Sequence, residues 1–155
     1  MPQILVIGYG NPLRGDDGLG WTVAAELFRQ NRSPGLEILP CHQLTPELVS
    51  IIREAETVVF IDCAHEGTPG ELGCVEVQPG PSQPTFTHDL TPSKLLALTC
   101  ELFGVCPKAY LLSICGSSFG PGETFSEAVT QGLADLRIKL HQLIDQQLGC
   151  AGARR

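Results

Sequence analysis

The sequence predicts an α/β fold of three layers, in which a mainly parallel, twisted five-stranded sheet lies between helices. Continuous apolar runs rich in Ile and Val occur at residues 3–8, 57–62 and 109–114, as in strands that are buried on both faces. Segments with apolar residues three and four apart lie between these runs and are typical of helices that cover a sheet. Strands that alternate with helices in this way favour a parallel sheet.

The first half of the chain supplies two strand–helix units. A helix is predicted over 16–31, after the strand at 3–8, and Asp16 is expected to cap its start. The apolar face of this helix is formed by Leu19, Val23, Ala24 and Leu27. A short strand follows at 36–39. A Thr-Pro pair then opens a second helix, which is expected to span about 45–55.

The second half continues the alternation after the strand at 57–62. A Gly- and Pro-rich segment follows, and within it residues 74–77 alternate between apolar and polar, as in a half-exposed strand at the edge of a sheet. We predict this edge strand to be the antiparallel one. The remaining elements are a helix from about 90 to 102, a strand at 109–114 and a long helix at 125–148.

No repeat or linker divides the chain, so residues 1–155 are predicted to form one domain, ordered over about 3–148. The tail at 149–155 carries no pattern and is expected to be flexible. A net charge of −7 argues against nucleic acid as a partner, because phosphates require clustered Lys and Arg. The sequence contains neither a long apolar span nor a secretory signal, so we expect a cytoplasmic protein without a membrane partner.

The cysteines are odd in number and include no CxxC pair. Several of them lie inside apolar runs, where a thiol behaves as a small hydrophobic group. We therefore expect buried or incidental thiols, and neither a disulfide framework nor a zinc site. The set consists of Cys41, Cys63, Cys74, Cys100, Cys106, Cys115 and Cys150.

Acidic residues stand where ligands bind in such folds. Asp16 and Asp17 lie where the loop after the first strand becomes a helix, and Asp62 ends the third strand. Because the carboxyl ends of parallel strands share one edge of the sheet, Asp17 of the first loop and Asp62 should converge there. A dinucleotide site is not favoured, since Leu13 stands where GxGxxG needs its third glycine, and the glycines are not followed by the Lys-Ser or Lys-Thr of a P-loop.

An imidazole would complete a donor set for a metal. His88, which precedes the predicted helix at 90, is one candidate, and His42 and His65 compete with it, whereas His141 is flanking. Two carboxylates and one imidazole suit a divalent ion of intermediate hardness, such as nickel, zinc, iron or manganese. The sequence contains neither HExxH nor GxSxG, so a zinc-protease helix and a serine nucleophile elbow are not indicated.

These residues together resemble the [NiFe]-hydrogenase maturation endopeptidases, most closely the cyanobacterial bidirectional type. The resemblance rests on Gly8-x-Gly10-Asn-x-Leu-x-x-Asp-Asp-Gly-x-Gly20, on the strand that ends at Asp62 and on the following His88. It implies that Asp17, Asp62 and His88 contact a metal and that Asp16 is a cap or a supporting residue. Some members of the family carry Glu where this chain has Asp17.

The resemblance also implies a function. The family removes a C-terminal extension from the hydrogenase large-subunit precursor after nickel insertion, so the nickel would be supplied by the substrate. The bound metal could polarise the carbonyl or activate water, or Asp17 could act as general base on a water. A nickel-binding module or chaperone without proteolysis is the main alternative, and a domain that binds NAD or FMN is a third.

Overall fold

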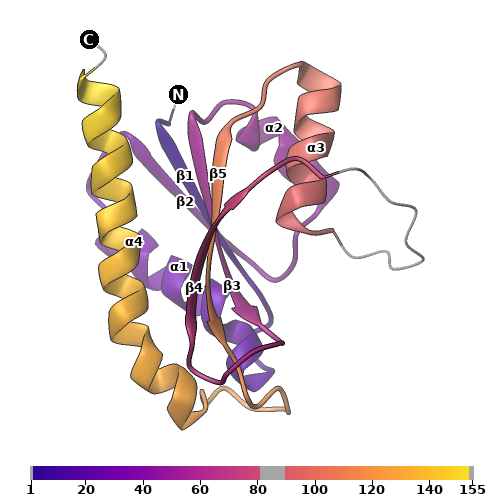
Figure 1. The fold of residues 1–155 in the computed structure, drawn as a ribbon, viewed down its shortest axis with the longest axis vertical. Coiled ribbons are helices and arrows are strands. Elements are labelled where there is room, and N and C mark those ends of the chain that lie inside the picture. The colour runs from indigo at the N-terminus through magenta and orange to yellow at the C-terminus, as the bar shows by residue number, and fades with distance from the viewer. Residues whose placement is uncertain (1, 81–89, 154–155) are drawn as a thin grey trace.

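The central sheet has five strands in the order β2-β1-β3-β5-β4 (Figure 1). The computed structural model describes residues 2–80 and 90–153. The strands are β1 (Ile4–Tyr9), β2 (Leu36–Cys41), β3 (Thr57–Ala64), β4 (Leu72–Val77) and β5 (Lys108–Cys115). All neighbouring pairs are parallel except β4 and β5, which are antiparallel. The predicted α/β fold and its antiparallel edge strand are thus confirmed.

Helices cover both faces of the sheet. The first face packs against α1 (Leu19–Gln30) and α4 (Glu127–Ala153), and the second against α2 (Val49–Ile52) and α3 (Pro92–Phe103). Strand β1 shows why two cores form: Ile4 and Val6 point into the first, and Leu5 and Ile7 into the second. Because alternate side chains of a strand point to opposite faces, a continuous apolar run serves both cores.

Two glycines bring the start of α1 against the sheet. A Cβ atom at Gly8, in β1, would collide with the carbonyl oxygen of Gly20, and one at Gly20 would collide with that of Ile61, in β3. Only hydrogen in place of a side chain permits this approach. The short 3-10 helix η1 (Gly15–Gly18), which precedes α1, is thereby held beside the carboxyl ends of β1 and β3.

The predicted helices differ from the observed ones mainly at their ends. The helix expected over 16–31 begins as η1 and becomes α-helical at Leu19. The helix expected over 45–55 is a 3-10 turn, η2 (Pro46–Leu48), followed by only four α-helical residues, and the chain then tightens so that the Ala55 N–H donates to Ile52 O. Helix α4 continues to Ala153, beyond the predicted end at 148.

The expectation that the cysteines form no disulfide is wrong for one pair. Cys100 and Cys106 are joined in a disulfide, with their Cα atoms 4.9 Å apart. Gly104 ends α3 in the left-handed conformation, with φ of 66°, and turns the chain back so that Cys106 reaches the helix. Within the described residues the thiols of Cys41, Cys63, Cys74 and Cys115 are unpaired.

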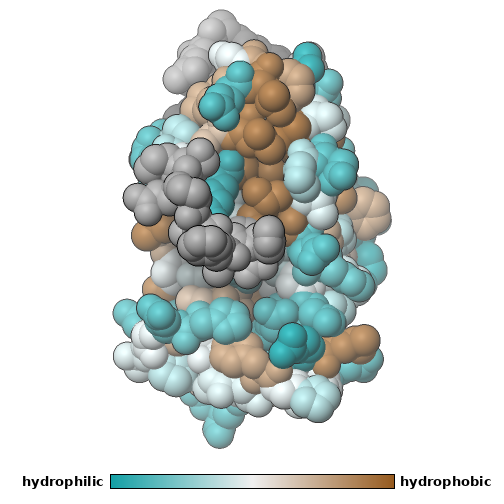
Figure 2. Space-filling model, turned by 90° about the vertical axis from the view of Figure 1, so that its right-hand side faces the viewer, coloured by the Kyte–Doolittle hydropathy of each residue, from teal (hydrophilic) through white to brown (hydrophobic). Residues whose placement is uncertain are grey.

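The side of the molecule on which α3 lies carries hydrophobic residues gathered in its upper half (Figure 2). A groove of about 510 Å³ runs between β4 and the start of α3, where Val75, Pro79 and Pro92 contribute to its walls. None of the helices in the described ranges combines the length and the hydropathy that crossing a bilayer would need.

Candidate functional site

A cleft of about 670 Å³ opens at the carboxyl ends of β1 and β3. This is the edge of an open α/β sheet at which ligands generally bind. Asp17 reaches the cleft from η1, and Asp62 reaches it from β3. The other lining residues are Tyr9, Gly10, His42, Gln43, Leu44, Thr45, Pro46, His65 and Leu90. The predicted convergence of the two acids is therefore observed.

The first loop holds the Asp17 carboxylate by its backbone. The Asn11 N–H donates to Asp17 Oδ2 at 2.8 Å. Gly10 permits this turn, because its φ of 142° is unfavourable for other residues and a Cβ atom there would collide with the Asp17 carbonyl oxygen. The second oxygen, Oδ1, lies 3.8 Å from His65 Nε2. One oxygen of Asp17 is thus fixed by a hydrogen bond, and the other faces an imidazole.

Asp62, which is half-buried near the end of β3, titrates unusually. Burial raises the pKa of its carboxyl to about 6, and the negative charge of Asp17 adds to the rise. Hydrogen bonds from the Cys63 N–H, at 2.7 Å, and from the Tyr9 hydroxyl oppose it. Burial and the charge of Asp62 also raise the pKa of Tyr9, which therefore stays protonated as a donor. Asp62 consequently exchanges a proton close to neutral pH.

Asp16 points away from the cleft and binds a distant loop. It is fully buried and accepts hydrogen bonds from the backbone N–H groups of Ser117 and Ser118, at 2.8 and 3.0 Å. The Ser126 N–H and hydroxyl both donate to it at 2.7 Å. Although burial raises the pKa of Asp16, these bonds outweigh that effect and hold the pKa below its usual value.

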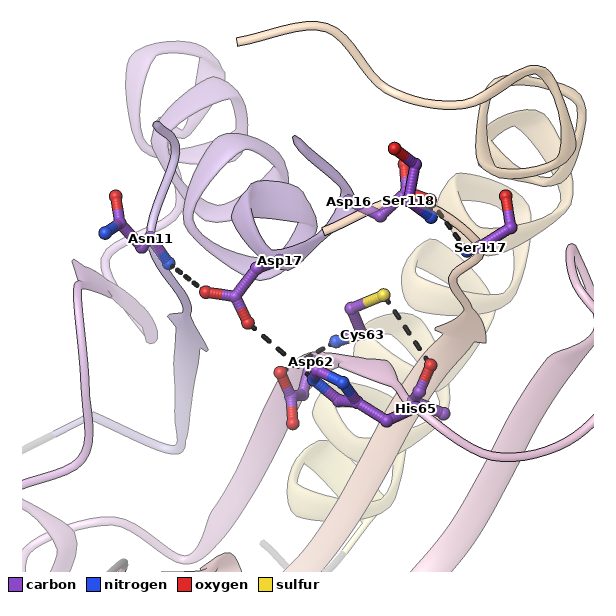
Figure 3. A network of polar contacts seen from close by, with 9 residues as sticks. Asn11, Asp16, Asp17, Asp62, Cys63, His65, Ser117 and Ser118 are labelled. Carbon is purple, nitrogen blue, oxygen red and sulfur yellow. Dashed lines mark hydrogen bonds and ion pairs between the residues drawn. The ribbon is translucent and has the colours of Figure 1, made fainter. Parts of the chain in front are cut away.

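The expectation that Asp16 caps its own helix is therefore wrong. Neither η1 nor α1 has a side-chain cap. A fully buried carboxylate needs several donors, and the loop between β5 and α4 supplies four. Ser126 in turn caps α4, because its hydroxyl accepts from the Val129 N–H at 3.3 Å. Figure 3 shows Asp16 turned toward Ser117 and Ser118, whereas Asp17, Asp62 and His65 face one another.

Of the histidines considered in the sequence, two line the cleft within the described residues. His88 lies outside the described residues. His65, which sequence reasoning placed below His88, faces Asp17, and its ring stacks on Phe119 with centroids 4.2 Å apart and 14° between the planes. His42 also lines the cleft. His141 is exposed on α4 and is not among the lining residues.

The chemistry open to the cleft follows from its donors. Asp17 and Asp62 offer hard carboxylate oxygens, which suit a divalent cation when an imidazole joins them. Within residues 2–80 and 90–153, no three His, Cys, Asp or Glu side chains lie close enough together to form a metal site by themselves. The same carboxylates could instead act as general acid or base on a water in the cleft.

The sequence matches no protein-family model and no curated protein. Solved structures do match. The [NiFe] hydrogenase maturation protease HycI from Thermococcus kodakarensis is 28% identical, with a TM-score of 0.70 over 95% of this chain and 92% of that one. The hydrogenase maturating endopeptidase HybD from E. coli is 22% identical, with a TM-score of 0.75 over 97% and 94%. The chain therefore shares its fold with [NiFe]-hydrogenase maturation proteases over most of its length.

Proposed function

We propose that this chain is an endopeptidase that removes the C-terminal extension of a [NiFe]-hydrogenase large-subunit precursor after nickel insertion. The observation that carries the proposal is the convergence of Asp17 and Asp62 in one cleft at the carboxyl edge of the sheet. The likeness to a maturation protease that is 28% identical over 95% of the chain supports the same function. The proposed partner is the large-subunit precursor of a [NiFe]-hydrogenase, and the resemblance of the sequence to the cyanobacterial bidirectional type makes that hydrogenase the first to test.

Nickel enters this proposal as part of the substrate. Asp17, Asp62 and His88 would together offer two carboxylates and an imidazole to the nickel that the precursor already carries. A donor set of this kind leaves coordination positions for ligands from the precursor. Cleavage would then depend on a loaded metal centre, because only a precursor that contains nickel completes the site.

The chain's own residues supply a route for hydrolysis. Asp17 is suited to take a proton from the attacking water, because Asn11 fixes one carboxylate oxygen and the other faces the cleft. Once protonated, Asp17 could pass that proton to the leaving amine, whereas Asp62, as a metal ligand, would stay ionised. The metal in the precursor would polarise the carbonyl at the scissile bond.

The test is a reaction between two purified components. The precursor large subunit, in nickel-loaded and nickel-free forms, is incubated with the protein, and its mass is measured over time. We expect the loaded precursor to lose its C-terminal tail and the nickel-free precursor to stay intact. Equal cleavage of both forms would show that the protein does not distinguish the nickel-loaded precursor from the nickel-free one. If the precursor binds the protein but its mass never falls, a nickel-binding module without proteolysis becomes the better account.

A further inference from the structure

The cleft contains an imidazole that the proposed donor set does not use. His65 follows β3 by one residue and leaves 59% of its side chain exposed, yet its Nε2 faces Asp17 Oδ1 at 3.8 Å. At that separation the pair is an electrostatic contact rather than a hydrogen bond. The Asp17 oxygen can therefore still accept a ligand while the imidazole lies beside it.

An exposed histidine keeps one orientation only if something holds its ring. The terminal torsions of His and Asp are broad, so neither side chain selects a single rotation by itself. For Asp17, the Asn11 N–H fixes one oxygen and His65 stands at the other. For His65, the nearly parallel ring of Phe119 covers one face. Stacked aromatic rings have preferred relative orientations, so this contact favours one orientation of the imidazole.

Phe119 is itself held by the rest of the fold. It is partly buried against the core between α1, α4 and the sheet. Its ring lies so close to Gly116 that a Cβ atom there would come within 2.7 Å of Phe119 Cζ. The neighbouring Ser117 and Ser118 are bonded to the buried Asp16. A continuous set of contacts thus leads from Asp16 through the loop to Phe119, then to His65 and finally to Asp17.

We propose that Phe119 is a positioning residue of this site, which holds the His65 imidazole against Asp17 and thereby keeps the Asp17 carboxylate turned into the cleft. The role in processing rests on the proposed function, whereas the effect on Asp17 does not require it. Supporting residues that orient a metal-binding or catalytic group commonly change affinity or rate about 10- to 100-fold when they are removed.

The first arm of the test uses the isolated protein, with neither nickel nor precursor. The Asn11 amide donates to Asp17 and therefore reports on that carboxylate in ¹H–¹⁵N spectra. We expect its signal to move in Phe119→Leu, which keeps apolar bulk but removes the flat ring, and to return in Phe119→Tyr. Phe28→Leu is the matched control, because Phe28 is exposed on α1 and does not line the cleft.

The second arm measures processing of the nickel-loaded precursor. Phe119→Leu should lower kcat about tenfold with little change in KM, and Phe119→Tyr should restore it. If the ring acts through the imidazole, Phe119→Leu should add nothing to His65→Ala in the double variant. Thermal unfolding of each variant checks that the protein stays folded.

The two proposals fail in different ways. If the wild-type protein leaves the precursor intact, the proposed function fails, and the Asn11 signal alone then decides whether Phe119 positions Asp17. An Asn11 signal that does not move in Phe119→Leu overturns the positioning role. Full kcat in Phe119→Leu, or additive losses in the double variant, overturns its role in processing.

Discussion

Asp16 and Ser126 are 110 residues apart in the sequence and are joined by two hydrogen bonds of 2.7 Å. Through them the first loop is fastened to the start of α4, while the neighbouring Asp17 faces the cleft. Two adjacent carboxylates thus have separate roles, one structural and one available for chemistry. Stability measurements on Asp16 variants and activity measurements on Asp17 variants can therefore test the two roles separately.

Asp16→Ala is expected to lower the free energy of unfolding by about 3 kcal/mol, because it removes the buried carboxylate that accepts the hydrogen bonds of the loop. Urea unfolding measures the change. Asp135→Ala is the matched control, because Asp135 is exposed on α4 and its substitution should change stability by less than about 0.5 kcal/mol. A loss in Asp16→Ala no larger than in that control would contradict the structural role.

The pKa of Asp16 also predicts a dependence on pH. The pKa is lower in the folded protein than its ordinary value of 3.8, so the carboxylate contributes stability above that value and loses it as pH falls through the folded pKa. Unfolding measured between neutral and acid pH should show a steeper loss in the wild-type protein than in Asp16→Asn. Parallel curves for the two proteins would contradict the assignment.

Unlike Asp16→Ala, which should lower the free energy of unfolding, Asp62→Asn should raise it above neutral pH. The folded pKa of Asp62 is raised from 3.8 to about 6, so ionising this half-buried carboxyl costs stability progressively as pH rises from about 4 to 6, and the cost then stays constant. The variant should be more stable than wild type at pH 8, by on the order of 2 kcal/mol, and nearly equal to it at pH 4. It should also lose processing activity. Equal stability at both pH values would show that burial does not penalise this carboxylate.

Gly10→Ala tests whether the turn of the first loop places Asp17. A methyl group at this position meets the Asp17 carbonyl oxygen and requires a backbone conformation that favours glycine, with φ of 142°. We expect the Asn11 amide signal to shift and processing to be lost. Gly149→Ala serves as control, because a Cβ atom there has no neighbour within 4 Å. Normal processing by Gly10→Ala would show that the backbone conformation at Gly10 is not needed to place Asp17.

The sequence predicted the sheet better than the contacts around the site. The runs at 3–8, 57–62 and 109–114 indicate strands because they must fill a core on both faces, and β1 does so. The acids Asp17 and Asp62 could be placed together, since parallel strands end at one edge. The length of a short helix such as α2 depends on local tightening that apolar spacing does not encode.

The partners of Asp16 and His65 were beyond the reach of local patterns. Asp16 looks like a helix cap in sequence, and only the folded chain brings Ser117 and Ser126 to it. The orientation of His65 depends on Phe119, which comes from the loop after β5. The Cys100–Cys106 disulfide likewise depends on the left-handed turn at Gly104. Each of these contacts requires the tertiary structure, whereas strand periodicity does not.

The central claim is that Asp17 acts in processing rather than in folding. The most direct measurement is the rate at which Asp17→Asn, compared with Asp135→Asn, removes the tail from the nickel-loaded precursor, followed by mass. The account predicts a folded Asp17→Asn protein whose rate falls at least about 100-fold, with the Asp135→Asn rate unchanged. Processing by Asp17→Asn at the wild-type rate would contradict the account.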